Sequence, residues 1–132
     1  MVQSESALFT RILRDTRNVA VVGLSPNPTR PSYGVARFLQ SLGWRVVPVN
    51  PGHAGETILG ETVVASLADI PDPGAIDMID IFRRSDAAGA VVEEALAALP
   101  NLRTVWMQLG VTAPHAAVLA RARGVDVVED RC

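Results

Sequence analysis

The fold is decided by the stretch VAVVGLSPNPTRPSYG, residues 19–34. A valine-rich apolar run stops at Gly23, a loop of Ser, Pro, Asn, Thr and Arg follows, and a helical pattern starts near Ser32. A strand, a loop and a helix N-terminus in this order form the arrangement with which α/β proteins hold a phosphate group. The stretch therefore predicts a phosphate-bearing ligand and leaves open which one.

Apolar runs and helical patterns alternate along the rest of the chain. The apolar runs are continuous, which is typical of parallel strands covered on both faces. The predicted strands are Asn18–Gly23, Trp44–Val49, Ile76–Phe82, Leu102–Met107 and Val125–Val128, and the predicted helices between them are Tyr33–Leu42, Asp86–Leu99 and Thr112–Arg123. Residues 62–67 fit either a short strand or a turn into a brief helix. The class is therefore α/β, a Rossmann-like three-layer fold with a five-stranded, mainly parallel sheet in the order 3-2-1-4-5.

The composition predicts a single domain over residues 1–132. With 48% hydrophobic and 20% charged residues the chain is globular, not disordered. No apolar run approaches the roughly 20 residues of a membrane span, and the N-terminus lacks the pattern of a signal peptide. We therefore expect a cytoplasmic protein with no membrane partner. The single cysteine, Cys132, excludes an internal disulfide and a cysteine-based metal site, and no metal ligands are predicted.

An N-terminal extension, residues 1–16, precedes the first strand. Within it, Ser4–Thr16 has apolar residues at helical spacing. This helix is expected to pack on the edge of the sheet or on a second subunit, which would make a homodimer.

Positive charge is concentrated around the decisive loop. From Thr16 to Gly55 there is no Asp or Glu, whereas the same window contains four arginines, at positions 17, 30, 37 and 45. The pattern favours an anion site, although arginines scattered on solvated helix faces would produce it as well. The chain is acidic overall and has few aromatic residues for base stacking, so nucleic acid is not an expected partner.

A dinucleotide such as NAD or NADP is the first candidate for the ligand. Its fingerprint requires G-x-G-x-x-G after the first strand, but Ser25 and Pro28 stand where the second and third glycines belong. An acidic residue should also end the second strand to bind the ribose, and here that strand ends Val49-Asn50-Pro51. The NAD(P)-binding oxidoreductase domain therefore remains only as the alternative.

The loop offers a different set of donors. Hydroxyl groups come from Ser25, Thr29, Ser32 and Tyr33, and Arg30 adds a guanidinium. The first N–H groups of the following helix contribute partial positive charge. The alternative is a turn that its prolines merely make rigid.

Several blocks, in order, carry a resemblance to a known family. They are residues 22–25, 30–35, 49–51, 58–60, 77–83, 105–110 and 130–132. Together they resemble the small stand-alone CoA-binding proteins, which are similar to the N-terminal domain of the succinate–CoA ligase alpha subunit. The resemblance extends over nearly the whole chain from about Thr10.

The resemblance implies a CoA-binding module without the catalytic domains of the ligase, with coenzyme A or an acyl-CoA as its ligand. The implied positions are as follows: Gly23, Ser25, Arg30, Pro31, Ser32 and Tyr33 at the phosphates; Asn50, Pro51 and His53 near the adenosine 3′-phosphate; Phe82 and Arg83 at the adenine or pantetheine; Met107, Gln108 and Leu109 on the neighbouring wall. One departure is His53, because the ligase domain tends to have Lys nearby.

No catalytic set is predicted. Asp77 and Asp80 lie three residues apart in a strand, so they are a poor acid–base pair, and Asp77 is interpreted as a capping or solvated residue. We expect a protein that is not an enzyme. Cys132 follows the last strand and can be interpreted in two ways. It is either an unreactive terminal thiol or a thiol that forms a mixed disulfide with CoA under oxidation. A third reading of the whole chain is an interaction subunit with a vestigial CoA site.

Overall fold

The computed structural model describes residues 4–132, and its main feature is a five-stranded parallel sheet. The sheet consists of β1 (Asn18–Val22), β2 (Arg45–Val49), β5 (Met78–Ile81), β6 (Thr104–Met107) and β7 (Asp126–Val128). Its described helices are α1 (Glu5–Asp15), α2 (Pro31–Ser41), α3 (Ser85–Ala98) and α4 (Pro114–Ala122). Beside β2 lies a small antiparallel hairpin of β3 (Thr57–Ile58) and β4 (Glu61–Thr62).

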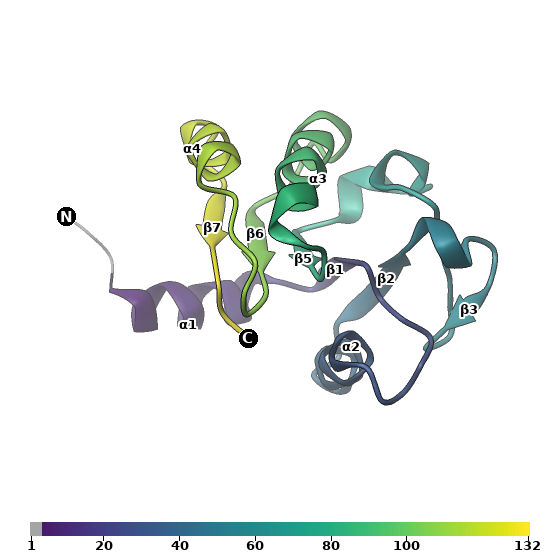
Figure 1. Ribbon diagram of the computed structural model, residues 1–132. Coiled ribbons are helices and arrows are strands. Elements are labelled where there is room, and N and C mark those ends of the chain that lie inside the picture. The colour runs from purple at the N-terminus through teal and green to yellow at the C-terminus, as the bar shows by residue number, and fades with distance from the viewer. Residues whose placement is uncertain (1–3) are drawn as a thin grey trace.

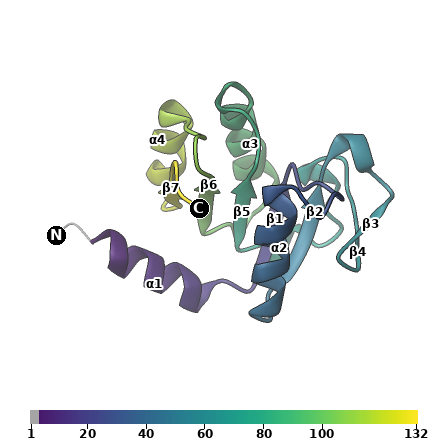
Figure 2. The same cartoon turned by 60° about the horizontal axis from the view of Figure 1, so that its bottom comes forward.

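The helices form two layers, one on each face of the sheet. In Figure 1, α3 and α4 lie above the sheet, and α1 and α2 lie below it. The turned view of Figure 2 shows α2 over β1 and β2, whereas α1 lies apart from it, toward β6 and β7. The predicted α/β class and the three-layer Rossmann-like fold are thus confirmed.

The strand order is β2-β1-β5-β6-β7. Counted along the chain over these five strands, this is 2-1-3-4-5. The third strand, β5, pairs with β1, whereas the expected order 3-2-1-4-5 placed the third strand outside β2. The place outside β2 holds only a parallel bridge between Val49 and Val64. This bridge falls within the segment 62–67, for which strand and turn were both left open.

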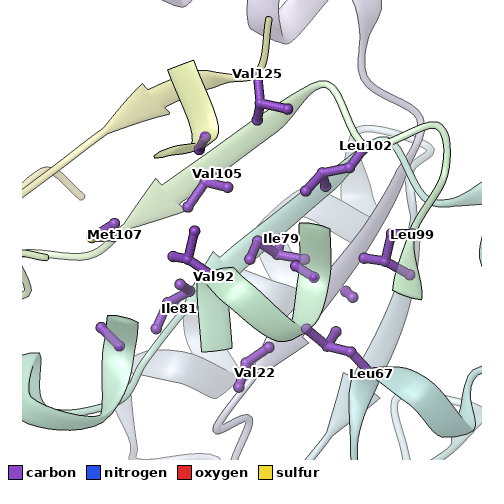
Figure 3. Packing of buried hydrophobic residues seen from close by; sticks show 14 of the residues in the cluster. Val22, Leu67, Ile79, Ile81, Val92, Leu99, Leu102, Val105, Met107 and Val125 are labelled. Carbon is purple, nitrogen blue, oxygen red and sulfur yellow. The ribbon is translucent and has the colours of Figure 1, made fainter. Parts of the chain in front are cut away.

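Both faces of the sheet are buried, which explains the continuous apolar runs. Ile79 and Ile81 of β5 and Val105 of β6 point toward α3 and α4, where they pack on Val92 and Leu99 (Figure 3). The intervening residues of the strands point to the other face, toward α1 and α2. This second face is less completely covered, and the consequence is described below.

The helix α1 is attached to the far end of the chain. Its Arg11 pairs with Asp126 of β7 at 2.7 Å, and Glu5 accepts a hydrogen bond from Nε of Arg131 at 2.9 Å. The rings of Phe9 and Trp106 are 5.1 Å apart between centroids. The helix therefore packs within the same chain, on the β6 and β7 side of the sheet.

Candidate functional site

Gly23 ends β1 at the point where the chain leaves the sheet. It has a φ of +87°, which favours glycine, and its N–H donates to the Val49 carbonyl at 2.8 Å. A Cβ at this position would lie 2.5 Å from the Phe82 carbonyl oxygen, too close for any side chain. The absence of a side chain therefore lets the loop after β1 pass directly over the end of β5.

Side-chain hydrogen bonds hold this loop against its neighbours. The Ser25 N–H donates to Ser32 Oγ at 3.0 Å, which ties the loop to the first turn of α2. Asn50, at the end of β2, donates from Nδ2 to the Leu24 carbonyl at 3.0 Å and accepts from the Gly52 N–H at 3.0 Å. The loop is thus fixed at both sides, and the space between its anchors stays open.

A cavity of about 360 Å³ opens at this carboxyl edge of the sheet. Its lining comes from the loop after β1, the first turn of α2, the segment after β2 and the end of β5: Gly23, Ser25, Arg30, Pro31, Ser32, Asn50, His53 and Phe82. Each of these residues was among the positions that the family resemblance implies. We call this space the phosphate cavity.

The charge of the phosphate cavity suits an anion. Among residues 4–132, no acidic residue lines it. Within residues 4–132, the Arg30 guanidinium forms no hydrogen bond or ion pair. Arg30 is the N-cap of α2, and the positive end of the helix dipole lies beside it. His53 Nδ1 lies 2.9 Å from Glu56 Oε2, so its ring is held in place at the rim.

The other arginines of the acid-free window lie elsewhere. Arg45 pairs with Glu61 at 2.9 Å and also with Asp72, so its charge is already compensated. Arg17 donates to the carbonyls of Arg14 and Thr16. Arg37 is exposed on α2 and does not line the cavity. The anion interpretation of the window therefore depends on Arg30 alone.

Three of the remaining predicted site residues are exposed and do not line the phosphate cavity. Pro51 begins the 3₁₀ turn after β2 and is exposed. Arg83 is exposed too, with its Cδ 3.2 Å from where a Cβ on Gly23 would lie. Leu109 is 73% exposed. Among them, Arg83 is next to the loop and carries a charge suited to phosphate.

The other three point away from the phosphate cavity. Tyr33 packs on the core beneath α1 and α2. Met107 is fully buried in the opposite core, beneath α3 and α4. Gln108, one residue further on, is buried on the α1 and α2 face, where its Nε2 donates to Asp80 Oδ1 at 2.6 Å. Consecutive residues at the end of a strand point to opposite faces, so these two do not form one wall.

Asp80 is the residue that the sequence reasoning missed. It lies within β5, its side chain is only 1% exposed, and it lines a second, apolar cavity on the α1 and α2 face. Burial raises the pKa of its carboxyl to about 7, and the hydrogen bond from Gln108 partly opposes this rise. An aspartate inside an apolar strand is a recognisable signal. Asp77, by contrast, accepts hydrogen bonds from the Arg17 and Asn18 N–H groups, as expected of a capping residue.

Comparison with known protein families shows to which family the chain with this fold and this phosphate cavity belongs. Residues 17–132 match the family described as CoA binding domain. The chain belongs to this CoA-binding domain family. The match begins just before β1, so it contains every residue that lines the phosphate cavity, whereas α1 precedes it.

Relatives of this CoA-binding domain are slightly longer than this chain, and the solved ones have a similar fold. Uncharacterized protein YneT of Bacillus subtilis is 34% identical over all of this chain and 93% of its own length. A solved structure from Thermus thermophilus, cell-free ID.343, is 35% identical with a TM-score of 0.87, covering 98% of this chain and 93% of that one. A hypothetical protein from Pyrococcus horikoshii OT3 is 30% identical with a TM-score of 0.86, covering 100% and 93%.

The donors of the phosphate cavity fit the ligand that the family description names. A phosphate needs charge-assisted and backbone donors, and the CoA-binding domain offers the unpaired Arg30 guanidinium, the first turn of α2 and a close backbone approach at Gly23. No helix among the described residues is long and apolar enough to cross a membrane.

Proposed function

We propose that the protein is a non-catalytic module that binds coenzyme A or an acyl-CoA. The observation that carries the proposal is the phosphate cavity. In the described part of the chain, residues 4–132, it has an unpaired Arg30, a helix N-terminus and no acidic residue. CoA is rich in phosphate, since it carries a pyrophosphate and a 3′-phosphate. The family match supports CoA as the ligand class.

The phosphate cavity suggests a division of roles. Gly23, Ser25 and the turn Arg30–Ser32 would bind the pyrophosphate, because they supply the backbone approach and the guanidinium. Asn50 and His53, on the side formed by the segment after β2, would lie toward the adenosine and its 3′-phosphate. Phe82 would provide the apolar wall.

The non-catalytic role agrees with how the polar groups are used. Asp77 is engaged as a cap, and Asn50 is engaged in holding the loop. With the resemblance to the ligase domain, this supports a binding module that leaves any chemistry to other proteins. We also propose that the module works in the cytoplasm.

Binding by calorimetry to CoA, dephospho-CoA, NADH and ATP tests the proposal. CoA is expected to bind most tightly, and the loss of the 3′-phosphate is expected to weaken binding. Tighter binding of NADH would favour the oxidoreductase-type domain instead, against which the non-acidic end of β2 argues. If none of the four binds, the chain is better described as an interaction subunit with a vestigial site.

Replacing Arg30 by Ala is expected to weaken CoA binding by roughly 1–3 kcal/mol, the scale of a charge-assisted hydrogen bond. Calorimetry measures the change directly. Arg37→Ala is the matched control, because Arg37 lies on the same helix and outside the phosphate cavity. Equal affinities of Arg30→Ala and the parent would refute the assignment of Arg30 to a phosphate.

The hypothesis of a mixed disulfide at Cys132 stays a prediction. The thiol is exposed and lies on the second cavity. Its thiolate would attack the disulfide of oxidised CoA, so that one CoA becomes attached to the protein and the other leaves as a thiol. Intact mass spectrometry is expected to show a gain of one CoA. No adduct, or an adduct that survives Cys132→Ser, would end the hypothesis.

A further inference from the structure

A second cavity, of about 500 Å³, lies between α1, α2 and the sheet. It occupies the less covered face that Figure 2 turns toward the viewer. Most of its walls are apolar: Phe9, Ile12, Leu13, Gly34, Val35, Phe38, Leu39, Trp44, Met78, Trp106 and Cys132. We call it the apolar cavity. A space of this size and character is typical of a small-molecule site.

The polar part of the apolar cavity is a single buried pair. Asp80 and Gln108 are 1% and 6% exposed, and they are joined by the 2.6 Å hydrogen bond. Within residues 4–132, Asp80 Oδ2 accepts no hydrogen bond, although the side chain lines the cavity. Among residues 4–132 no fully buried side-chain polar atom lacks a partner, so Asp80 Oδ2 is open to the cavity, where a ligand group can form a hydrogen bond with it.

The same two elements of the fold contribute to the lining of both cavities. The first turns of α2 contribute to both, since Pro31 and Ser32 line the phosphate cavity, and Gly34 and Val35 line the apolar one. The end of β5 contributes to both as well, because Asp80 lines the apolar cavity and Phe82, two residues on, lines the phosphate cavity. One elongated ligand with phosphates at one end and an apolar group at the other would match this arrangement.

We propose that the apolar cavity receives the acyl group of an acyl-CoA, and that this group is an uncharged hydrocarbon. The inference rests on the proposed function. Of the residues that the structure describes, no Arg or His lines the apolar cavity, and the one ionisable wall residue besides Cys132 is Asp80. The acyl group of a dicarboxylic acid, such as succinyl, would place its free carboxylate against apolar walls and Asp80. The Asp80–Gln108 pair would lie next to the polar atoms that precede the hydrocarbon chain.

Calorimetry on the full chain with CoA, butyryl-CoA, hexanoyl-CoA and succinyl-CoA tests the inference. Each buried methylene is expected to tighten binding by up to about fourfold, until the chain fills the cavity. Hexanoyl-CoA is therefore expected to bind at least tenfold more tightly than CoA, and succinyl-CoA no more tightly than CoA. Equal affinities for CoA and hexanoyl-CoA, with CoA itself binding, would overturn the inference and leave the proposed function in place. No binding of any CoA compound would overturn both.

The Gly34→Phe variant tests whether the apolar cavity binds the acyl group, because its side chain would fill part of that cavity. A Cβ at Gly34 meets no heavy atom within 4 Å, so the helix can accept a side chain there, and the position lines only the apolar cavity. The variant is expected to bind CoA within twofold of the parent and to lose the gain for hexanoyl-CoA. Gly34→Leu provides a smaller substitution, and circular dichroism checks the folding of both. A gain that persists in both folded variants would contradict the assignment of the cavity.

A second copy of the chain is the competing occupant, because Leu13 and Phe38 at the rim are 53% and 60% exposed. Analytical ultracentrifugation of the parent and of Phe38→Glu, which measures the oligomeric state, distinguishes an acyl group from a second copy of the chain as the occupant. A monomeric parent that shows the acyl gain supports the inference. A dimer that Phe38→Glu dissociates, together with no acyl gain, would make this face a subunit interface and overturn the inference.

Discussion

The Asp80→Asn variant is expected to be about 4 kcal/mol more stable than the parent at pH 8 and equally stable at pH 4. The reason is burial, which raises the pKa of Asp80 to about 7 in the folded chain, whereas an unfolded aspartate has a pKa of about 3.9. At a pH between these two pKa values, the Asp80 carboxyl is therefore protonated in the folded state and ionised in the unfolded state.

The direction of the pH dependence follows from that proton. As the pH rises from about 4 to 7, the folded parent must retain the proton or bury a charge, so its free energy of unfolding falls relative to a neutral side chain. Asparagine resembles the protonated carboxyl and has no such dependence. Above pH 7 the full difference remains.

Urea denaturation of both proteins between pH 4 and pH 8 measures this difference. Asp86→Asn is the control, because Asp86 is an exposed aspartate paired only with Arg84, so its effect should stay within about 1 kcal/mol at every pH. A difference between Asp80→Asn and the parent that does not change with pH would show that folding does not raise the pKa of Asp80.

Replacing Gly23 by Ala is expected to lower the free energy of unfolding by about 2–4 kcal/mol, the sum of left-handed backbone strain and overpacking. Its φ is +87°, and the added Cβ would lie 2.5 Å from the Phe82 carbonyl oxygen. That neighbour is backbone, so it cannot rotate away as a side chain could. Because Gly23 and Phe82 both line the phosphate cavity, CoA binding is expected to weaken as well.

Gly34→Ala is the matched control for this second prediction. Gly34 lies inside α2, without positive φ and with nothing within 4 Å of an added Cβ. Alanine there is expected to stabilise the chain by roughly 0.5–1 kcal/mol, since glycine weakens a helix interior. Chemical denaturation compares the two variants, and a Gly23→Ala protein as stable as the parent would show that the loop can move away from β5.

Much of the fold and of the phosphate cavity was predictable, because each depended on local signals. The apolar runs identified the strands, since parallel strands buried on both faces contain few polar residues. Gly23, Arg30 and Ser32 were predictable because the ends of parallel strands gather at one edge of the sheet. Val64 was less predictable, since a single bridge leaves almost no pattern in the sequence.

The apolar cavity was not predictable, because it depends on which face a side chain takes and on how a distant helix packs. Met107 and Gln108 were grouped as one wall, yet they lie on opposite faces of the sheet. Asp80 was considered only as a partner of Asp77. The contribution of Phe9 depends on α1 packing against Trp106, a contact between segments far apart in the sequence.

Both tryptophans of the chain, Trp44 and Trp106, line the apolar cavity, and neither lines the phosphate cavity. Indole emission depends on the polarity around the ring, so the tryptophan fluorescence of this protein reports on the apolar cavity. The molecule thus contains an unlabelled optical sensor, which distinguishes a ligand that enters between α1 and α2 from one that remains at the phosphate-binding loop.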